Sequence, residues 1–551
     1  MFLNGLFSIL GTCGIITAAM AHERAYGGLI EINQEYTKAL HMDFQHFLKE
    51  FVPMVAKKTK QLNKAYWILE TTGSIDAADL KAELDAELRF LFNDPKVYAQ
   101  LLAWERAGLE DPILKRQLNV LIRAFKQNQA PRALLEELAQ KEAALAQSYA
   151  SFRPELDGKV ISENGIKEIL KTETNEERRK RAWEVSKKIG PVLAPQILEL
   201  VKLRNQIAKS LGYCDYFQMQ LELQEVDAKW LLNMLDDLAK KSDKAYLGVI
   251  AELKTKLGDI SPWFWTEPFC QEDPLDNKEL DDLVEDVDIS ARSAAFYQRL
   301  NVNVDSILKR SDMEERPGKN QHAFCIHIDR EGDVRTLNNV RSSIKWLETV
   351  LHELGHAIYE IGFDADLPWL LKEPPHMITT EAMALIAGRQ AYKRDSLQFL
   401  VGKSLPTVEK GLKRRQLIFS RWVLVMTEFE SELYRDPNQD LNALWWHLVE
   451  KYQKIPQPQN RSGASDWACK YHIGLAPVYY FSYLLGELFA SAIQESLLKE
   501  CNDTGLSNEK TGKFLQEKLF GPGNRMSWDE LIRHVTGKPL TGDAWIKEFC
   551  S

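Results

Sequence analysis

The chain has 551 residues, of which 45% are hydrophobic and 27% are charged, and its formal net charge at pH 7 is −9. This composition is typical of a globular protein and excludes a disordered chain. Basic runs such as residues 177–181 are short and mixed with acids, so the charge pattern indicates no nucleic-acid partner. Because one core rarely serves more than about 300 residues, we expect two lobes or one large helical domain.

The N-terminus has the features of a targeting segment. Residues 1–21 carry no charge and end in Ala19-Met20-Ala21, although a basic first region is missing. We therefore expect a signal or leader at 1–21, one domain of two lobes at 22–551, and a periplasmic or secreted protein. A cytoplasmic protein, a membrane anchor and a buried first helix stay open as alternatives. No later stretch is long and apolar enough to predict a stable membrane domain.

The remaining chain reads mostly as helix. Residues 30–255 show the apolar spacing of amphipathic helices, and residues 256–286 are rich in Pro, Asp and aromatic side chains, which indicates a loop or a lobe junction. Helix returns at 287–301. Residues 321–339 hold two short strands around a turn, and helices resume from 342 to the end. We predict a mainly α fold with one small antiparallel sheet.

The segment that follows this strand pair carries a metal-binding motif. Residues 348–362 read ETVLHELGHAIYEIG and have helical periodicity. On a helix, His352 and His356 lie one turn apart on one face, where two imidazoles can bind one Zn²⁺. Glu353 is adjacent and can reach a water at that ion. Because a short motif of this kind also occurs by chance, further ligands are needed to support the prediction.

A third ligand is expected shortly downstream. The Pro-Pro pair at 374–375 prevents a helix there, and a threonine at 379–380 can cap a new helix that opens at Glu381. If this helix packs on the first, its carboxylate reaches the metal. His376 is the alternative third ligand.

A second polar cluster lies about a hundred residues further on, within residues 468–493. The later part of this segment has helical periodicity and places Tyr480 and Tyr483 on one face. Lys470 and His472 precede it in an extended stretch. Such donors are suited to an anion, including the oxyanion of a tetrahedral intermediate.

These motifs together resemble the angiotensin-converting-enzyme family of zinc peptidases, in particular its single-domain bacterial members. The resemblance is densest over residues 310–390 and 467–493, where HELGH with a later Glu, HAFCI, KYHI and YFSY match the family's pattern. It implies a large two-lobed helical domain with a deep central channel, and a small sheet next to the zinc site.

The resemblance also implies roles for the matching residues, which fall into metal ligands, catalytic groups and substrate contacts. One Zn²⁺ per chain would be bound by His352, His356 and Glu381; Glu353 would be the general base and His472 and Tyr483 the oxyanion donors; His322, Ala323, Lys470 and Tyr480 would bind the peptide.

The chain departs from the family's pattern at several positions. Tyr483 lies one residue later than usual, so Tyr479 is the alternative oxyanion donor. Ser482 replaces the arginine of chloride-activated members, Gln321 replaces a cysteine, and Leu385 stands where an acid is expected behind the ligands.

The predicted function is that of a zinc metallopeptidase that acts on short peptides and releases C-terminal dipeptides. A thimet-type oligopeptidase or a metallocarboxypeptidase on a related fold is the alternative. An inactive peptide-binding protein is less favoured, because Glu353 and all three ligands are present. Peptides are the expected partners, and the oligomeric state stays open.

Overall fold

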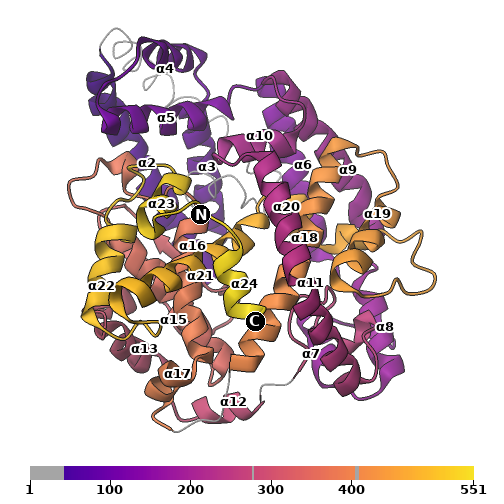
Figure 1. Cartoon of the computed structure of the whole chain (residues 1–551). Coiled ribbons are helices and arrows are strands. Elements are labelled where there is room, and N and C mark those ends of the chain that lie inside the picture. Colours follow the sequence, from indigo (N-terminus) through magenta and orange to yellow (C-terminus); the bar gives the residue numbers. More distant parts are fainter. Residues whose placement is uncertain (1–42, 276–277, 404–408) are drawn as a thin grey trace.

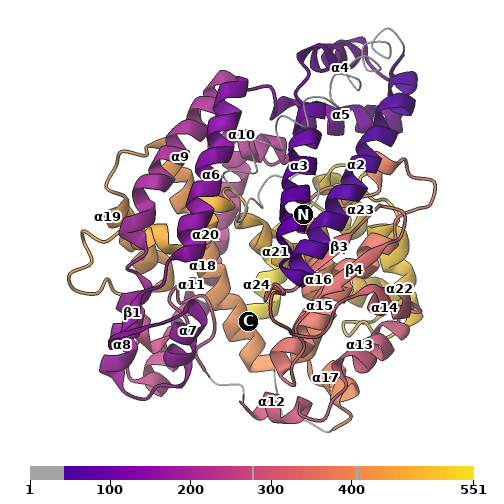
Figure 2. The same cartoon turned by 180° about the vertical axis from the view of Figure 1, so that it is seen from behind.

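The computed structural model describes residues 43–275, 278–403 and 409–551, so the predicted leader at 1–21 lies outside the described residues. The described chain is mainly α-helical, which confirms the predicted fold class. Two groups of helices stand side by side, with a third group at the N-terminal end lying along and above one of them (Figures 1 and 2). None of the described helices combines the length and apolarity that a bilayer span requires.

The N-terminal group consists of two long helices and two shorter ones with an apolar cluster of their own, which includes Phe47, Phe51 and Leu121. All four begin after an aspartate or serine whose side chain accepts a backbone N–H, as N-caps do. The helices are α2 (Phe44–Thr72), α3 (Ile75–Leu91), α4 (Pro95–Ala107) and α5 (Pro112–Lys126).

The first lobe contains the middle of the chain and a later segment. Its elements are α6 (Arg132–Ser151), β1 (Glu155–Leu156), β2 (Lys159–Val160), α7 (Glu163–Thr172), α8 (Glu176–Ser186), α9 (Gly190–Ser210), α10 (Tyr216–Leu223), α11 (Ala228–Leu257), η1 (Pro262–Phe264), α18 (Glu409–Arg435), α19 (Leu441–Leu448), η4 (Val449–Gln453), η5 (Asp466–Cys469) and α20 (Tyr471–Leu475).

The second lobe contains the remaining elements. These are α12 (Lys278–Val284), α13 (Ile289–Gln298), α14 (Asp305–Arg310), β3 (Phe324–His327), β4 (Val334–Leu337), α15 (Ile344–Ile361), η2 (Trp369–Leu371), α16 (Met377–Arg389), η3 (Gln390–Tyr392), α17 (Arg394–Val401), α21 (Phe481–Cys501), α22 (Glu509–Leu515), η6 (Gln516–Phe520), α23 (Trp528–Thr536) and α24 (Asp543–Phe549).

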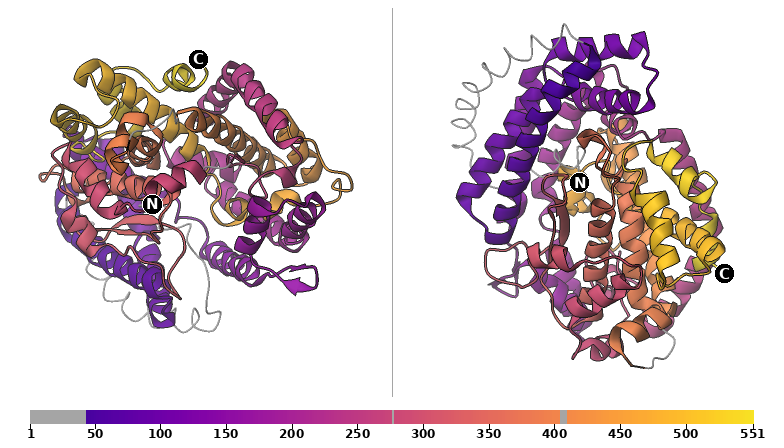
Figure 3. Two further views of the ribbon diagram at one scale, coloured as in Figure 1. Left: turned by 90° about the horizontal axis from the view of Figure 1, so that it is seen from below. Right: turned by 90° about the vertical axis from the view of Figure 1, so that its left-hand side faces the viewer.

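The two lobes share one core. A single apolar cluster runs from Trp183 and Leu235 in the first lobe to Leu351 and Leu488 in the second. Figure 3 shows the helices of both lobes from two further directions. Because burying apolar surface is the main stabilising contribution to folding, the shared cluster fixes how the elements of the two lobes meet.

The prediction of a single small sheet was incomplete, since the described residues form two. Residues 155–160, within the stretch expected to be helical, form a short hairpin in which Glu155 pairs with Val160. Its turn residues Asp157 and Gly158 both have positive φ, at 52° and 76°. An Asp-Gly pair suits this turn, because type I′ hairpin turns need two residues that tolerate positive φ.

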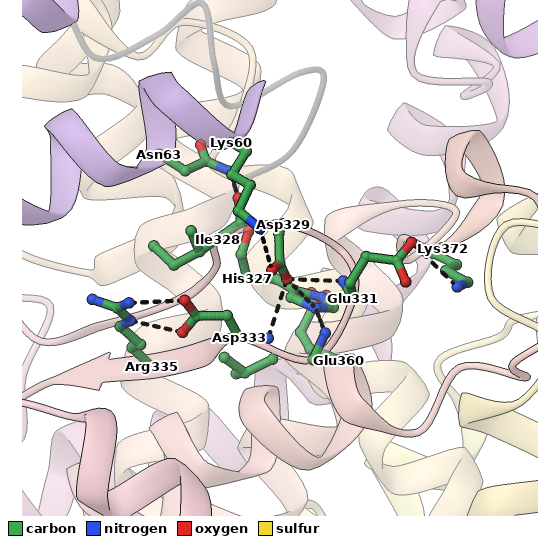
Figure 4. A network of polar contacts seen from close by, with 12 residues as sticks. Lys60, Asn63, His327, Ile328, Asp329, Glu331, Asp333, Arg335, Glu360 and Lys372 are labelled. Atoms are coloured by element: carbon green, nitrogen blue, oxygen red, sulfur yellow. Dashed lines mark hydrogen bonds and ion pairs between the residues drawn. The ribbon is translucent and has the colours of Figure 1, made fainter. Parts of the chain in front are cut away.

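The predicted hairpin next to the motif is confirmed. Strand β3 pairs antiparallel with β4 from Phe324 opposite Leu337 to His327 opposite Val334. In the turn between them, the Asp329 carboxylate accepts the backbone N–H groups of Glu331 and Asp333, as Figure 4 shows. These two hydrogen bonds cap the turn locally.

Polar contacts tie this hairpin to two helices (Figure 4). From α2, the Asn63 amide donates to the carbonyls of His327 and Ile328, and the Lys60 ammonium lies 3.0 Å from Asp329. On the other side, Nδ1 of His327 lies 3.3 Å from Glu360, near the C-terminal end of α15. The hairpin is therefore held between the N-terminal helices and the helix that carries the metal motif.

Candidate metal centre and active site

Helix α15 presents the two motif histidines as neighbours. Their ring centroids lie 4.9 Å apart. The helix begins after Ser343, whose hydroxyl accepts the N–H of Trp346. Close packing on α16 depends on Gly355, because a Cβ atom there would lie only 2.7 Å from the Cα of Ala384. Any larger residue at this position would separate the two helices.

Helix α16 brings Glu381 to the histidines. Its two carboxylate oxygens lie 3.7 Å from Nε2 of His352 and 3.7 Å from Nε2 of His356. Three ligands around a tetrahedral Zn²⁺, each about 2 Å from the ion, stand roughly 3.3 Å apart, so this donor set fits the ion. Among the described residues it is the only such group of His, Cys, Asp or Glu.

A threonine behind the triad orients one of its histidines. The hydroxyl of Thr380 lies 2.7 Å from Nδ1 of His356, which leaves Nε2 facing Glu381. Partners of this kind fix the tautomer and the direction of a metal-binding imidazole. The prediction that residue 379 or 380 caps α16 was wrong, since the helix begins earlier, at Met377.

His376, the alternative third ligand, has a structural role instead. Its Nδ1 accepts the N–H of Ile378 as the N-cap of α16, and its Nε2 lies 3.2 Å from the Gln224 side-chain oxygen. Burial lowers its pKa to about 3, so the ring is neutral. With both nitrogens engaged, it has no lone pair to offer a metal.

Glu353 is buried next to the triad without belonging to it. Burial, and then the charge of Glu381, raise the pKa of its carboxyl to about 8. A carboxyl whose pKa lies near the working pH can both take and return a proton, as a general base requires. A cation bound at the triad would lower this pKa by direct attraction.

Two tyrosines from the start of α21 and the residues before it lie next to Glu381. The rings of Tyr479 and Tyr483 are 5.4 Å apart and nearly perpendicular. Burial and the Glu381 charge raise the pKa of both phenols, so each keeps its proton and can donate it to an oxyanion. The structure thus places both the predicted donor and its alternative at the site.

His472 also faces the site from the first lobe. Its ring is 4.7 Å from that of Tyr480, and its Nδ1 atom is buried with no hydrogen-bond partner among the described residues. Burial, then the charges of Lys470 and His322, lower its pKa to about 3. A neutral imidazole with one unused nitrogen is ready to bond a bound peptide, since buried polar atoms otherwise find partners.

Lys470 and Tyr480 converge on a residue that the sequence did not indicate. The amide oxygen of Gln271 accepts from the Lys470 ammonium at 3.3 Å and from the Tyr480 hydroxyl at 2.9 Å. Gln271 lies in the segment 256–286, which has no helical or strand periodicity, so no sequence signal pointed to it. The buried ammonium lies over the rings of three aromatic residues, Phe269, Trp422 and Tyr480.

This ammonium makes no direct contact with a carboxylate of the described residues. Within the described residues, Lys470 forms no ion pair, although Glu267 is near enough to influence its pKa. Burial lowers that pKa to about 8, and Glu267 partly offsets the effect. A buried cation without a direct ion pair is costly, and an anion bound beside it would reduce that cost.

The proposed peptide-binding strand lies at the edge of its sheet. His322 and Ala323 come directly before β3, and the N–H of His322 donates to the Asn320 side chain. In the described chain β3 pairs with β4 alone, so no described strand pairs with its other edge. Asn63 from α2 covers the far end of that edge, at His327. An extended peptide would therefore add at the His322 end.

The departures from the family pattern are consistent with the structure. Leu385 is apolar and packs against the core, and Ser482 is buried with a hydroxyl that has no partner among the described residues. The six cysteines of the described chain are free thiols: Cys214, Cys270, Cys325, Cys469, Cys501 and Cys550.

A mainly helical fold with a His-His-Glu donor set beside a buried glutamate defines a metallopeptidase of the His-Glu-x-x-His class. Two family models match separate parts of this chain. The model described as angiotensin-converting enzyme matches residues 39–260, and that of peptidase family M3 matches residues 307–550. The chain is therefore a metallopeptidase that is similar to angiotensin-converting enzyme in its N-terminal part and to peptidase family M3 in the C-terminal part that carries the triad.

Curated relatives agree with this assignment at low identity. Carboxypeptidase 1 of Bacillus subtilis is 24% identical over 402 residues, which cover 65% of this chain and 73% of that protein. Angiotensin-converting enzymes of rabbit (Oryctolagus cuniculus) and golden hamster (Mesocricetus auratus) are 23% and 22% identical, over 41% and 66% of this chain. The aligned residues span only 19% and 31% of those two animal enzymes.

Proposed function

We propose that the protein is a zinc-dependent peptidyl-dipeptidase that removes two residues from the free C-terminus of short peptides. The observation that carries this proposal is the buried ammonium of Lys470, which forms no direct ion pair among the described residues and is held with the Tyr480 hydroxyl around Gln271. A cation, a phenol and an amide N–H₂ together suit a carboxylate, and charge-assisted hydrogen bonds are about twice as strong as neutral ones. The C-terminal carboxylate of a peptide is the anion that this cluster would bind.

The residues around the triad would divide the chemistry between them. His352, His356 and Glu381 would hold Zn²⁺, which when bound supplies Lewis acidity to water and to the scissile carbonyl. Glu353 would accept the proton of the attacking water and pass it to the leaving amine. Neutral His472 and the phenol of Tyr483, with Tyr479 beside it, would donate to the developing oxyanion.

The substrate would lie extended between the two lobes. Its backbone would pair with the exposed edge at His322 and Ala323, which gives affinity without regard to sequence. Its carboxylate would reach the cluster of Gln271, Lys470 and Tyr480 in the first lobe. Binding would therefore require an unfolded peptide with a free C-terminus.

Two observations each favour another candidate activity. The similarity to Carboxypeptidase 1 fits release of single residues, and the match of residues 307–550 to family M3 fits internal cleavage. All three activities share the same triad and general base. They differ in how far the carboxylate-binding group lies from the scissile bond.

One experiment separates these activities. A mixed pool of short peptides is incubated with the enzyme, with and without chelator, and the fragments are identified by mass spectrometry. Chelator-sensitive dipeptides from free C-termini support the proposal, whereas single residues favour the carboxypeptidase activity and internal fragments favour the oligopeptidase activity. The same peptides as C-terminal amides should be cleaved with kcat/KM lower by about tenfold or more, since a hydrogen bond to a charged group contributes roughly 1.5–3 kcal/mol.

A matched pair of variants assigns this preference to one side chain. Lys470→Ala should remove the difference between acid and amide. Lys499→Ala, which changes an exposed lysine of α21, should keep it. Equal cleavage of acid and amide by the unaltered enzyme would contradict the role of the cluster.

A further inference from the structure

A cavity of about 180 Å³ lies beside the triad, between the N-terminal helices α3 and α5, the first-lobe helices α6 and α10, and the start of α16. This volume holds on the order of ten water molecules. Thr380 and Tyr479 line it, and Thr380 bonds the triad residue His356. None of Lys470, Gln271 and Tyr480 lines it, so it is distinct from the carboxylate cluster.

The position of the cavity relative to the triad and to the Lys470 cluster indicates which part of a substrate would enter it. A peptide with its C-terminal carboxylate at Lys470 and its scissile bond at the triad continues past the triad, away from Lys470. Extended chain advances about 3.3 Å per residue, so one or two residues upstream of the bond would pass Thr380 and Tyr479. The cavity that opens there is available to their side chains.

The charges around the cavity are not balanced. Each acid in its wall is already paired with an arginine behind it. These pairs are Glu142 with Arg204, Glu373 with Arg330, and Glu225 with Arg116. Two further arginines line the cavity, and one of them, Arg89, lies 3.5 Å from Asp85. Within the part of the chain that the structure describes, the other, Arg123, has its ion pair with the Glu225 carboxylate that Arg116 already holds.

The geometry at Glu225 shows how fully that carboxylate is committed. Arg116 donates to both of its oxygens, at 2.6 Å and 3.0 Å, and is itself fixed by the Asn524 side chain at 2.6 Å. Arg123 shares one of these oxygens through Nη1. Two guanidinium groups therefore face one carboxylate, and the second of them lines the cavity.

We propose that this cavity is a subsite for the part of the peptide upstream of the scissile bond, and that Arg123 gives it a preference for an acidic side chain. The proposal rests on the proposed function, because it takes the orientation of the substrate from the Lys470 cluster. A planar guanidinium can bond a carboxylate through two parallel N–H groups, which an uncharged amide side chain cannot match. Its partly buried position makes the interaction stronger than at an open surface.

The test uses paired N-acetylated tetrapeptides that carry Glu or Gln either one or two residues before the scissile bond. The unaltered enzyme should cleave the Glu peptide of one pair with kcat/KM at least about tenfold above its Gln partner. Arg123→Gln should reduce this ratio to about one. Arg123→Lys, which keeps the charge, should retain a smaller preference.

A control arginine and a binding measurement complete the design. Arg178→Gln, on an exposed face of α8 and paired with Glu173, should leave the ratio unchanged. Equal cleavage of Glu and Gln peptides in both pairs, with dipeptides still released, overturns the subsite and leaves the proposed function intact. If no dipeptide is released from any peptide, the proposed function fails. Calorimetric binding to Glu353→Gln then decides the subsite: an Arg123-dependent preference for the Glu peptide supports it, and equal binding overturns it.

Discussion

The Oε1 atom of Glu430 accepts a hydrogen bond from the backbone N–H of Val478 at 2.9 Å, and the Gln224 side chain donates to the Val478 carbonyl at 3.2 Å. Val478 has a φ of 55°, which is unusual for a β-branched residue and costs about 1–3 kcal/mol. Two buried side chains thus hold a strained residue directly before Tyr479. These two hydrogen bonds, here called the Val478 clamp, fix the backbone from which the tyrosines at the site follow.

Glu430 should make stability depend on pH. Burial raises the pKa of its carboxyl to about 8, although the Val478 N–H and the charge of Arg204 act in the opposite direction. Because this pKa exceeds the ordinary value of about 4.3, stability is present at low pH and lost as pH rises toward 8. Glu430→Gln cannot ionise, so its free energy of unfolding relative to wild type should rise across that interval by up to a few kcal/mol. Denaturant unfolding at several pH values measures this, and parallel profiles for the two proteins would contradict it.

Removing the Glu430 side chain should act on catalysis through the clamp. Glu430→Ala leaves the buried N–H of Val478 without a partner, at a cost of about 1–3 kcal/mol, and frees the strained residue to relax. We expect kcat to fall while metal content stays constant, since Glu430 touches no ligand. Glu432→Gln, on the same helix and paired with Arg435 near the surface, should leave kcat unchanged.

Glu353→Gln should separate metal binding from turnover. The side chain lies beside the triad without belonging to it, so the metal should stay while kcat falls by about 10²–10⁴-fold. His352→Ala removes a donor and should lose the metal itself. Atomic absorption together with kcat for both variants decides the assignment; near-normal turnover in Glu353→Gln would remove the general base from the mechanism.

Thr380→Val should weaken metal binding without removing a ligand. The variant keeps the shape of the side chain and deletes the hydroxyl that lies 2.7 Å from Nδ1 of His356. Loss of such a partner typically lowers metal affinity about 10–100-fold. Competition with a chelator of known affinity measures this. Thr379→Val is the control, because its hydroxyl bonds the His376 carbonyl and no ligand; equal affinities for both variants would refute the role of Thr380.

Discrimination between free and amidated C-termini should weaken at high pH. Burial lowers the pKa of Lys470 to about 8, with Glu267 opposing and Lys167 assisting this effect. Below that pH the ammonium is charged and attracts a carboxylate; above it the attraction is lost as the proton leaves. The ratio of kcat/KM for acid over amide should therefore fall as pH rises through about 8, since kcat/KM reports ionisations of the free enzyme. A ratio constant between pH 6 and 9 would exclude Lys470 as the cause.

Local patterns in the sequence were enough for the motif helix and its neighbours. The spacing of His352 and His356 follows from the helical repeat, and the strands at 321–339 follow from residue type and turn chemistry. The Pro-Pro pair and the following apolar run predicted a helix that carries Glu381. Its start was misplaced, because the cap is a histidine rather than the expected threonine. The polar cluster of Lys470, His472 and the tyrosines was visible in the sequence, but only the resemblance to a family gave each of these residues a role.

Only the tertiary structure placed Gln271 between Lys470 and Tyr480 and set Thr380 behind His356. It also showed that Arg123 shares the Glu225 carboxylate with Arg116. Each of these contacts joins segments that lie far apart in the sequence, so no helical or strand repeat predicts the contact. Secondary structure depends on side chains three or four residues apart, which a sequence displays directly. A site depends on which helix faces pack together, and that is decided by burial and close packing summed over the whole core.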